Sequence, residues 1–132
     1  MEKNINPKVS EWLGDMTNLI NVLANASYGS SWFNFGVLKG TYETYLTPRE
    51  RETLVCREPK WASVLLNGGS IEVYDVEEEE PHTLDFNMLL VGASKLMEEH
   101  PQVMQRLLDE EDDFYDNDAI IQYSIFGEWV YG

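Results

Sequence analysis

The fold class is decided by the stretch NGGSIEVYDVEEEE, residues 67–80. Its first three residues form a turn signal that typically ends a helix, because Asn and Gly tolerate the left-handed backbone found there. Residues 70–76 then alternate apolar and polar side chains, which predicts a half-buried β-strand. A strand needs a pairing partner, and either the aromatic segment 32–38 or the segment 41–45 could supply it. The four glutamates that follow predict an exposed loop.

Helical patterns precede this strand. Apolar residues recur at helical spacing between positions 9 and 23, so one helix is expected over residues 7–28. The sequence TPRE at residues 47–50 is a capping box with proline in the first turn, which predicts a helix that begins at Pro48. A short helix is expected over residues 59–66.

Three more helices are expected after the strand. Thr83 can cap the first, whose apolar stripe runs over residues 86–97. Residues 103–108 supply the second, and Asp116 or Asn117 can cap the last. We therefore predict an α+β protein, with a mostly helical single domain and a small β-sheet around strand 70–76.

Charge divides residues 1–132 into two halves of this one domain. The chain carries 9 Lys and Arg against 24 Asp and Glu, a formal net charge of −15 at pH 7. Residues 1–69 hold seven acidic and seven basic side chains, and form a charge-neutral scaffold half. Residues 70–132 hold seventeen acidic side chains and only Lys95 and Arg106 as bases. Such a charge repels nucleic acid and anionic membranes, so we expect direct binding to neither.

The acidic excess is concentrated in two blocks. Holding like charges together costs stability, and a basic partner would remove that cost. We therefore interpret the blocks as a partner-binding surface, although a solvated loop remains the alternative for each of them. The candidate residues are Glu77, Glu78, Glu79 and Glu80 in the first block, and Asp109, Glu110, Glu111, Asp112, Asp113, Asp116 and Asp118 in the second.

A surface that fixes about ten carboxylates can present a field like that of DNA. Phosphates follow one another about every 3.4 Å along one strand of a duplex. Carboxylates four residues apart on a helix lie about 5–6 Å apart, a spacing of the same order. The predicted partner is a Lys- and Arg-lined groove that normally binds nucleic acid, and association with it is expected to be fast and salt-sensitive. Mimicry by both blocks together requires them to share one face.

No catalytic or metal-binding signature accompanies the charge. An EF-hand needs oxygen ligands at fixed loop positions and a glycine at the sixth, and neither Asp112 nor Asp116 begins such a loop. Zinc is poorly supplied by one cysteine and by His82 and His100, which are far apart in the sequence. Cys56 is expected to be a small packed core residue. We predict no enzyme, no cofactor and no specific metal site.

Two stretches of the chain carry a recognisable set of residues. They are Glu58, Trp61-Ala62, the run from Leu65 to Ile71, Asp75, Glu77, Asp118-Ala119, Gln122-Tyr123, Phe126-Gly127-Glu128 and Val130-Tyr131-Gly132. In these residues the chain resembles the small acidic proteins of phages and integrative mobile elements, over roughly residues 58–132. The resemblance implies an accessory protein of a mobile element in the cytoplasm of a bacterial host, and it transfers no active site.

Small acidic proteins of such elements often resemble anti-CRISPR or anti-restriction inhibitors. The resemblance and the charge together imply an anti-CRISPR inhibitor, with a Cas effector as the first candidate partner and a restriction enzyme as the second. Two other hypotheses stay open. An adaptor for a host or phage protein would use an apolar patch around Trp129 and Tyr131. An enzyme or metal-binding protein is the third, and a homodimer is expected if the aromatic C-terminus is exposed.

Overall fold

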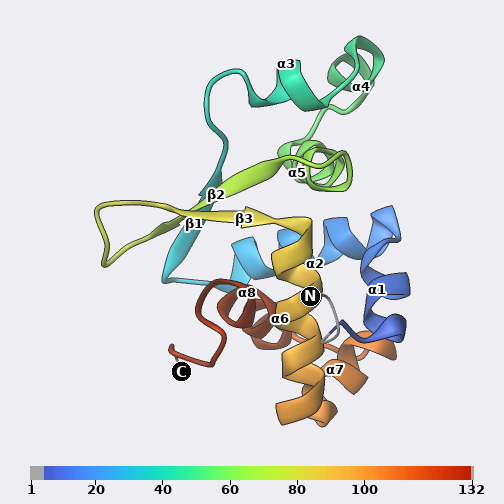
Figure 1. Cartoon of the computed structure of the whole chain (residues 1–132), viewed down its shortest axis with the longest axis vertical. Coiled ribbons are helices and arrows are strands. Elements are labelled where there is room, and N and C mark those ends of the chain that lie inside the picture. The colour runs from blue at the N-terminus through green and yellow to red at the C-terminus, as the bar shows by residue number, and fades with distance from the viewer. Residues whose placement is uncertain (1–4, 132) are drawn as a thin grey trace.

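In the computed structural model, which describes residues 5–131, strand β2 (Ser70–Asp75) is the centre of a three-stranded antiparallel sheet (Figure 1). Strand β1 (Phe33–Gly36) pairs with one edge of β2, and strand β3 (His82–Asp85) pairs with the other. The predicted strand around 70–76 and the α+β class are therefore confirmed.

The sequence predicted one of the two strands that pair with β2. The segment 32–38 does contain the partner strand β1, whose Phe33 lies opposite Asp75. The other candidate was wrong, because residues Thr41–Tyr45 form the short helix α3. Strand β3 was missed, and its His82 lies opposite Val73.

The described part of the chain also contains eight helices. Figure 1 shows α3 to α5 at one end of the molecule, with α1, α2, α6, α7 and α8 gathered at the other. Helix α2 packs against both α5 and α8, and so joins the two ends. The bounds are α1 Pro7–Leu13, α2 Met16–Gly29, α3 Thr41–Tyr45, α4 Pro48–Thr53, α5 Arg57–Leu66, α6 Phe86–Glu99, α7 Pro101–Leu108 and α8 Phe114–Phe126.

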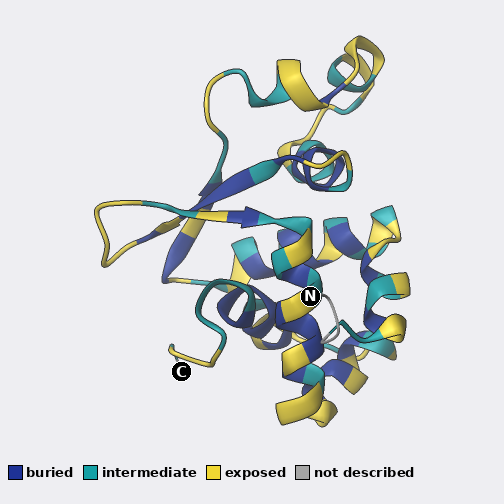
Figure 2. Cartoon of the chain, in the orientation of Figure 1, coloured by how far each residue is buried: buried dark blue, intermediate teal, exposed yellow. Residues whose placement is uncertain are grey.

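Helix α8 lies deep in the core, and seven of its residues are buried (Figure 2). Its residues Ile120 and Ile121 are fully buried, and it packs against α2 and α6. The contact with α6 is close because Gly92 lies there: a Cβ on Gly92 would stand 2.5 Å from the backbone nitrogen of Ser124. A side chain at position 92 would therefore push the two helices apart.

The single N-terminal helix expected over residues 7–28 is in fact two helices. Helix α1 ends at Leu13, and Gly14 forms its C-cap. The Asp15 carboxylate then accepts hydrogen bonds from the backbone N–H groups of Thr17 and Asn18, at 2.9 and 3.3 Å, and so begins α2. The apolar spacing continued across the break and concealed it, because both helices bury their apolar faces in the same core.

Helix caps were the least predictable local features. The box at 47–50 is confirmed, since the Thr47 side chain and the Glu50 side chain each accept a backbone N–H of the other residue. The cap predicted at Thr83 was wrong, because Asp85 caps α6. The cap predicted at Asp116 or Asn117 was also wrong: Asp113 caps α8, and Asp116 closes its capping box. Aspartates three residues apart offer equivalent patterns, and only packing selects between them.

Two further expectations from the sequence concern Cys56 and membrane-spanning helices. Cys56 is exposed, so the expectation of a packed core residue was wrong; it lies just before α5, and its backbone forms the helix cap without help from its side chain. Among residues 5–131, no helix combines the length and apolar character that a membrane span needs.

Candidate functional site

The loop between β2 and β3 carries the first acidic block and projects from the sheet (Figures 1 and 2). All four glutamates of residues 77–80 are exposed. Asp75 anchors the loop at its start, because its Oδ1 accepts the backbone N–H of Glu77 at 2.9 Å and its carbonyl accepts that of Glu78 at 3.2 Å. The predicted exposed loop is confirmed, and the block is displayed on a defined turn.

No Lys or Arg lies within ion-pair distance of this loop among the described residues. The two bases of the acidic half are engaged elsewhere: Lys95 lies 3.8 Å from Glu99, and Arg106 pairs with Asp116. His82 is the nearest group that could carry a positive charge. The negative charge of the loop is thus left to solvent or to a partner.

Three potential metal ligands meet at the base of the loop. The Nε2 atom of His82 lies 3.3 Å from an oxygen of Glu78 and 3.9 Å from an oxygen of Asp75. One ligand atom from each residue lies within 4.8 Å of the others. Sequence analysis missed this cluster, because only the pairing of β3 with β2 returns His82 to the side of Asp75, and β3 is too short to be recognised from its sequence pattern.

The C-terminal segment docks beside this cluster. The fully buried Gln122 holds it, because its Oε1 accepts the backbone N–H groups of Val130 and Tyr131 at 2.8 and 2.7 Å. Its Nε2 donates to the carbonyl of Tyr131 at 3.0 Å. The ring of Tyr131 stacks on Trp32 with centroids 5.0 Å apart. Tyr131 therefore packs against the core, while Trp129 and Val130 remain exposed.

Tyr131 links the segment to the acidic loop. Its hydroxyl donates to the Asp75 carboxylate at 3.1 Å, across 56 positions of sequence. Burial of the phenol is the largest cause that raises the pKa of Tyr131, and the Asp75 carboxylate adds to it. The phenol is consequently held as a neutral hydrogen-bond donor.

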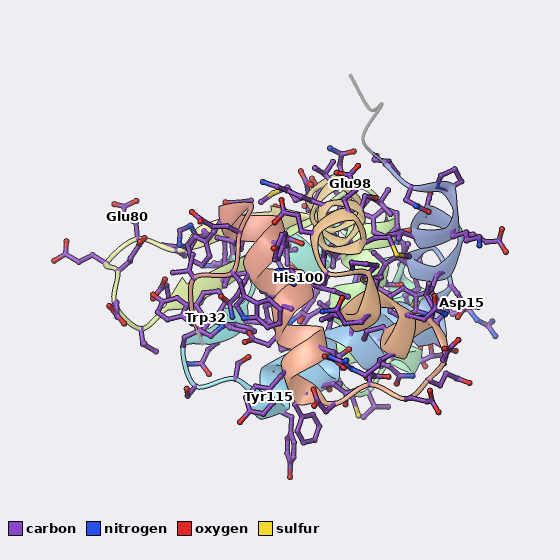
Figure 3. All side chains as sticks on the ribbon, turned by 90° about the horizontal axis from the view of Figure 1, so that it is seen from below. Asp15, Trp32, Glu80, Glu98, His100 and Tyr115 are labelled. Carbon is purple, nitrogen blue, oxygen red and sulfur yellow. The ribbon has the colours of Figure 1, made fainter. Side chains whose placement is uncertain are left out.

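An aromatic groove of about 650 Å³ opens next to Tyr131. Asp118 lies in its wall, where one carboxylate oxygen accepts from the Ser30 hydroxyl at 2.7 Å and from Trp32 Nε1 at 2.6 Å. In Figure 3, Trp32 lies between Glu80 and Tyr115 on the face in view. The lining residues are Gly29, Ser30, Ser31, Trp32, Tyr115, Asp118, Trp129 and Tyr131.

Most carboxylates of the second block serve the fold. Asp116 is buried, and its two oxygens accept from the Arg106 guanidinium at 2.8 and 2.6 Å. That hydrogen bond is the main reason that the pKa of Arg106 is raised. Asp113 caps α8, Asp112 accepts from Asn117 at 2.7 Å, and Asp109 accepts from Gln105 at 3.0 Å.

The two blocks do not lie together. Figure 3 shows Glu80 at one edge of the molecule, while the connection from α7 to α8 lies on the other side of helix α8. Of the second block, only Asp118 belongs to the groove beside the loop. Glu110 and Glu111 are exposed on the distant connection. The two blocks therefore do not share one face, and this arrangement does not favour mimicry of DNA by both blocks together.

No protein-family model, curated protein or solved structure matches the chain.

Proposed function

We propose that this protein inhibits a basic nucleic-acid-binding protein of a bacterial defence system by occupying its nucleic-acid-binding surface. A Cas effector is the first candidate partner, as for an anti-CRISPR protein, and a restriction enzyme is the second. The observation that carries the proposal is the exposed run Glu77–Glu80, which projects from the sheet with no Lys or Arg within ion-pair distance among the described residues.

The contact surface is the β2–β3 loop together with the adjoining groove. A basic groove that neutralises phosphates would be attracted to the four loop carboxylates over a Debye length of about 10 Å at 0.1 M salt. The groove supplies a second feature that suits a basic partner. An arginine of the partner can stack on the exposed ring of Tyr115 or Trp129, and Asp118 in the groove wall adds charge attraction to this cation–π contact.

This surface is narrower than the two acidic blocks that the sequence indicates. Asp113 and Asp116 are committed to the cap of α8 and to Arg106, so we do not include them in the contact surface. Glu110 and Glu111 are exposed on the connection from α7 to α8, outside this contact surface, and supply a matched control.

The adaptor hypothesis keeps one supporting observation. Trp129 and Val130 are 37% and 50% exposed at the C-terminal segment, which is an apolar surface that a non-basic partner could cover. Binding through these residues would depend little on salt, since apolar contacts are not screened.

The test is capture from lysates that express candidate Cas effectors and restriction enzymes, with the tagged protein as bait. The wild type is compared with a loop variant, Glu79→Gln with Glu80→Gln, and with Glu110→Gln and Glu111→Gln, which removes the same charge elsewhere. We expect capture of an effector that DNA and about 1 M salt displace, because the Debye length there is about 3 Å. The loop variant should bind more weakly, and the control variant should bind like the wild type.

Two outcomes would overturn the proposal. Capture that survives both salt and DNA would favour the adaptor hypothesis. Capture of none of the candidate effectors would leave the acidic loop without the partner that we propose for it.

A further inference from the structure

We propose that Asp75, Glu78 and His82 bind one divalent transition-metal ion of the zinc class at the base of the β2–β3 loop. This inference goes beyond the proposed inhibitor function and does not depend on it.

The separations of the three donor atoms suit such an ion. Nitrogen and oxygen ligands lie about 2.0–2.1 Å from zinc, so two ligands of a tetrahedral site are about 3.4 Å apart. The His82 Nε2 atom lies 3.3 Å from the Glu78 oxygen and 3.9 Å from the Asp75 oxygen. All three donor atoms lie within 4.8 Å of one another, so adjustment of the side chains, above all of the exposed Glu78, would bring them into coordination distance.

A second, independent observation points into the same space. The Nε2 atom of His82 is buried and has no hydrogen-bond partner within residues 5–131, because its approach to Glu78 lacks hydrogen-bond geometry. The Asp75 side chain beside it is 1% exposed and has no Lys or Arg partner in the described chain. A buried nitrogen without a partner and a buried carboxylate without a full counter-charge each cost stability. One bound cation would satisfy both groups.

Neighbouring groups fix the orientation of two of the three ligands. Asp75 accepts hydrogen bonds from the Tyr131 hydroxyl and from the backbone N–H of Glu77, which hold its carboxylate in place. The His82 ring packs edge-on against Phe126 with centroids 5.4 Å apart. Such outer contacts orient metal ligands and contribute to affinity. Asp75 and His82 also sit on paired strands, so the ladder fixes the distance between their backbones.

The donor set selects the class of metal. One imidazole and two carboxylates suit zinc and its neighbours among divalent transition metals, whereas Mg²⁺ and Ca²⁺ prefer oxygen ligands alone. Three protein ligands leave at least one position for water. The ion would also tie the acidic loop to both strands, because Glu78 lies in the loop and the other two ligands lie at its ends.

The experiment is calorimetric titration of the metal-stripped full chain with Zn²⁺ in the presence of excess Mg²⁺. Each ligand variant has a matched control that removes the same group outside the cluster: Glu78→Gln against Glu79→Gln, and His82→Gln against His100→Gln. Circular dichroism verifies that every variant is folded. Co²⁺ absorption provides a second readout, because its visible bands report nitrogen and oxygen coordination.

We expect one Zn²⁺ per chain, with affinity weakened roughly tenfold or more by Glu78→Gln and His82→Gln, and within about twofold of wild type in both controls. The thermal midpoint of the wild type should rise with Zn²⁺, since the ion binds the folded state. Absence of a saturable site would overturn the proposal. Equal weakening by Glu78→Gln and Glu79→Gln would also overturn it, because it would indicate diffuse attraction to the acidic loop.

Discussion

Replacing Gln122 with alanine should release the C-terminal segment from the core. The wild-type side chain is fully buried and makes four hydrogen bonds: two from the backbone of Val130 and Tyr131, one to the Tyr131 carbonyl and one to Asp118. Each such bond contributes about 1 kcal/mol net. The released segment can regain some of this by hydrating its backbone, so we expect the free energy of unfolding to fall by about 3 kcal/mol.

The matched control is Gln105→Ala. Gln105 is exposed and makes one side-chain hydrogen bond, to Asp109, so its loss should change the free energy of unfolding by no more than about 0.5 kcal/mol. Urea unfolding measures both variants. Hydrogen exchange then locates the effect, because the amides of Val130 and Tyr131 should lose protection in Gln122→Ala alone. The reasoning is refuted if the two variants differ by less than about 0.5 kcal/mol or if those amides stay protected.

Three other predictions concern the core and the second acidic block. Gly92→Ala should lower the free energy of unfolding by about 2–3 kcal/mol in urea, because the new Cβ would stand 2.5 Å from the Ser124 nitrogen; an unchanged midpoint would contradict the packing. Asp116→Asn should lower the thermal midpoint clearly more than Glu111→Gln, which removes the same charge, because only the Asp116 carboxylate is buried in an ion pair. Equal midpoints for the two variants would contradict this. Burial, and next the hydrogen bond to Glu99, raises the pKa of Tyr123 from 10 to about 12. The neutral Tyr123 phenol therefore contributes fully to the free energy of unfolding below pH 10, and this contribution is lost as the pH rises from 10 to 12. Urea unfolding over that range should therefore show less loss for Tyr123→Phe than for wild type, and identical losses would contradict the shift.

Sequence reasoning succeeded where a pattern is local and long enough to be read. The apolar stripe of α6 and the capping box at residues 47–50 each depend on neighbours within a few positions. Strand β3 escaped because its four residues are too few to show alternation, and because Thr83 within it also fits a helix cap. The break at Gly14 and Asp15 escaped because the apolar spacing continues through it.

Of the candidate site, the sequence predicted only the exposed negative charge. The exposed loop at residues 77–80 follows from composition, since four consecutive glutamates are not buried. Its support does not follow, because the contact between Asp75 and Tyr131 joins positions that are 56 residues apart. The structural work of Asp116 was also hidden: its partner Arg106 is ten positions away in another helix, and composition alone cannot separate a paired carboxylate from a free one.

The most direct test of the central claim is displacement of DNA from a purified candidate effector. Labelled duplex DNA is bound to the effector, and its fluorescence anisotropy is followed as this protein is added at low salt. The account predicts that the wild type releases the DNA, that Glu79→Gln with Glu80→Gln requires a higher concentration, and that Glu110→Gln with Glu111→Gln behaves like the wild type. DNA that stays bound at saturating protein on every candidate effector would contradict the account, as would equal loss of potency in both double variants.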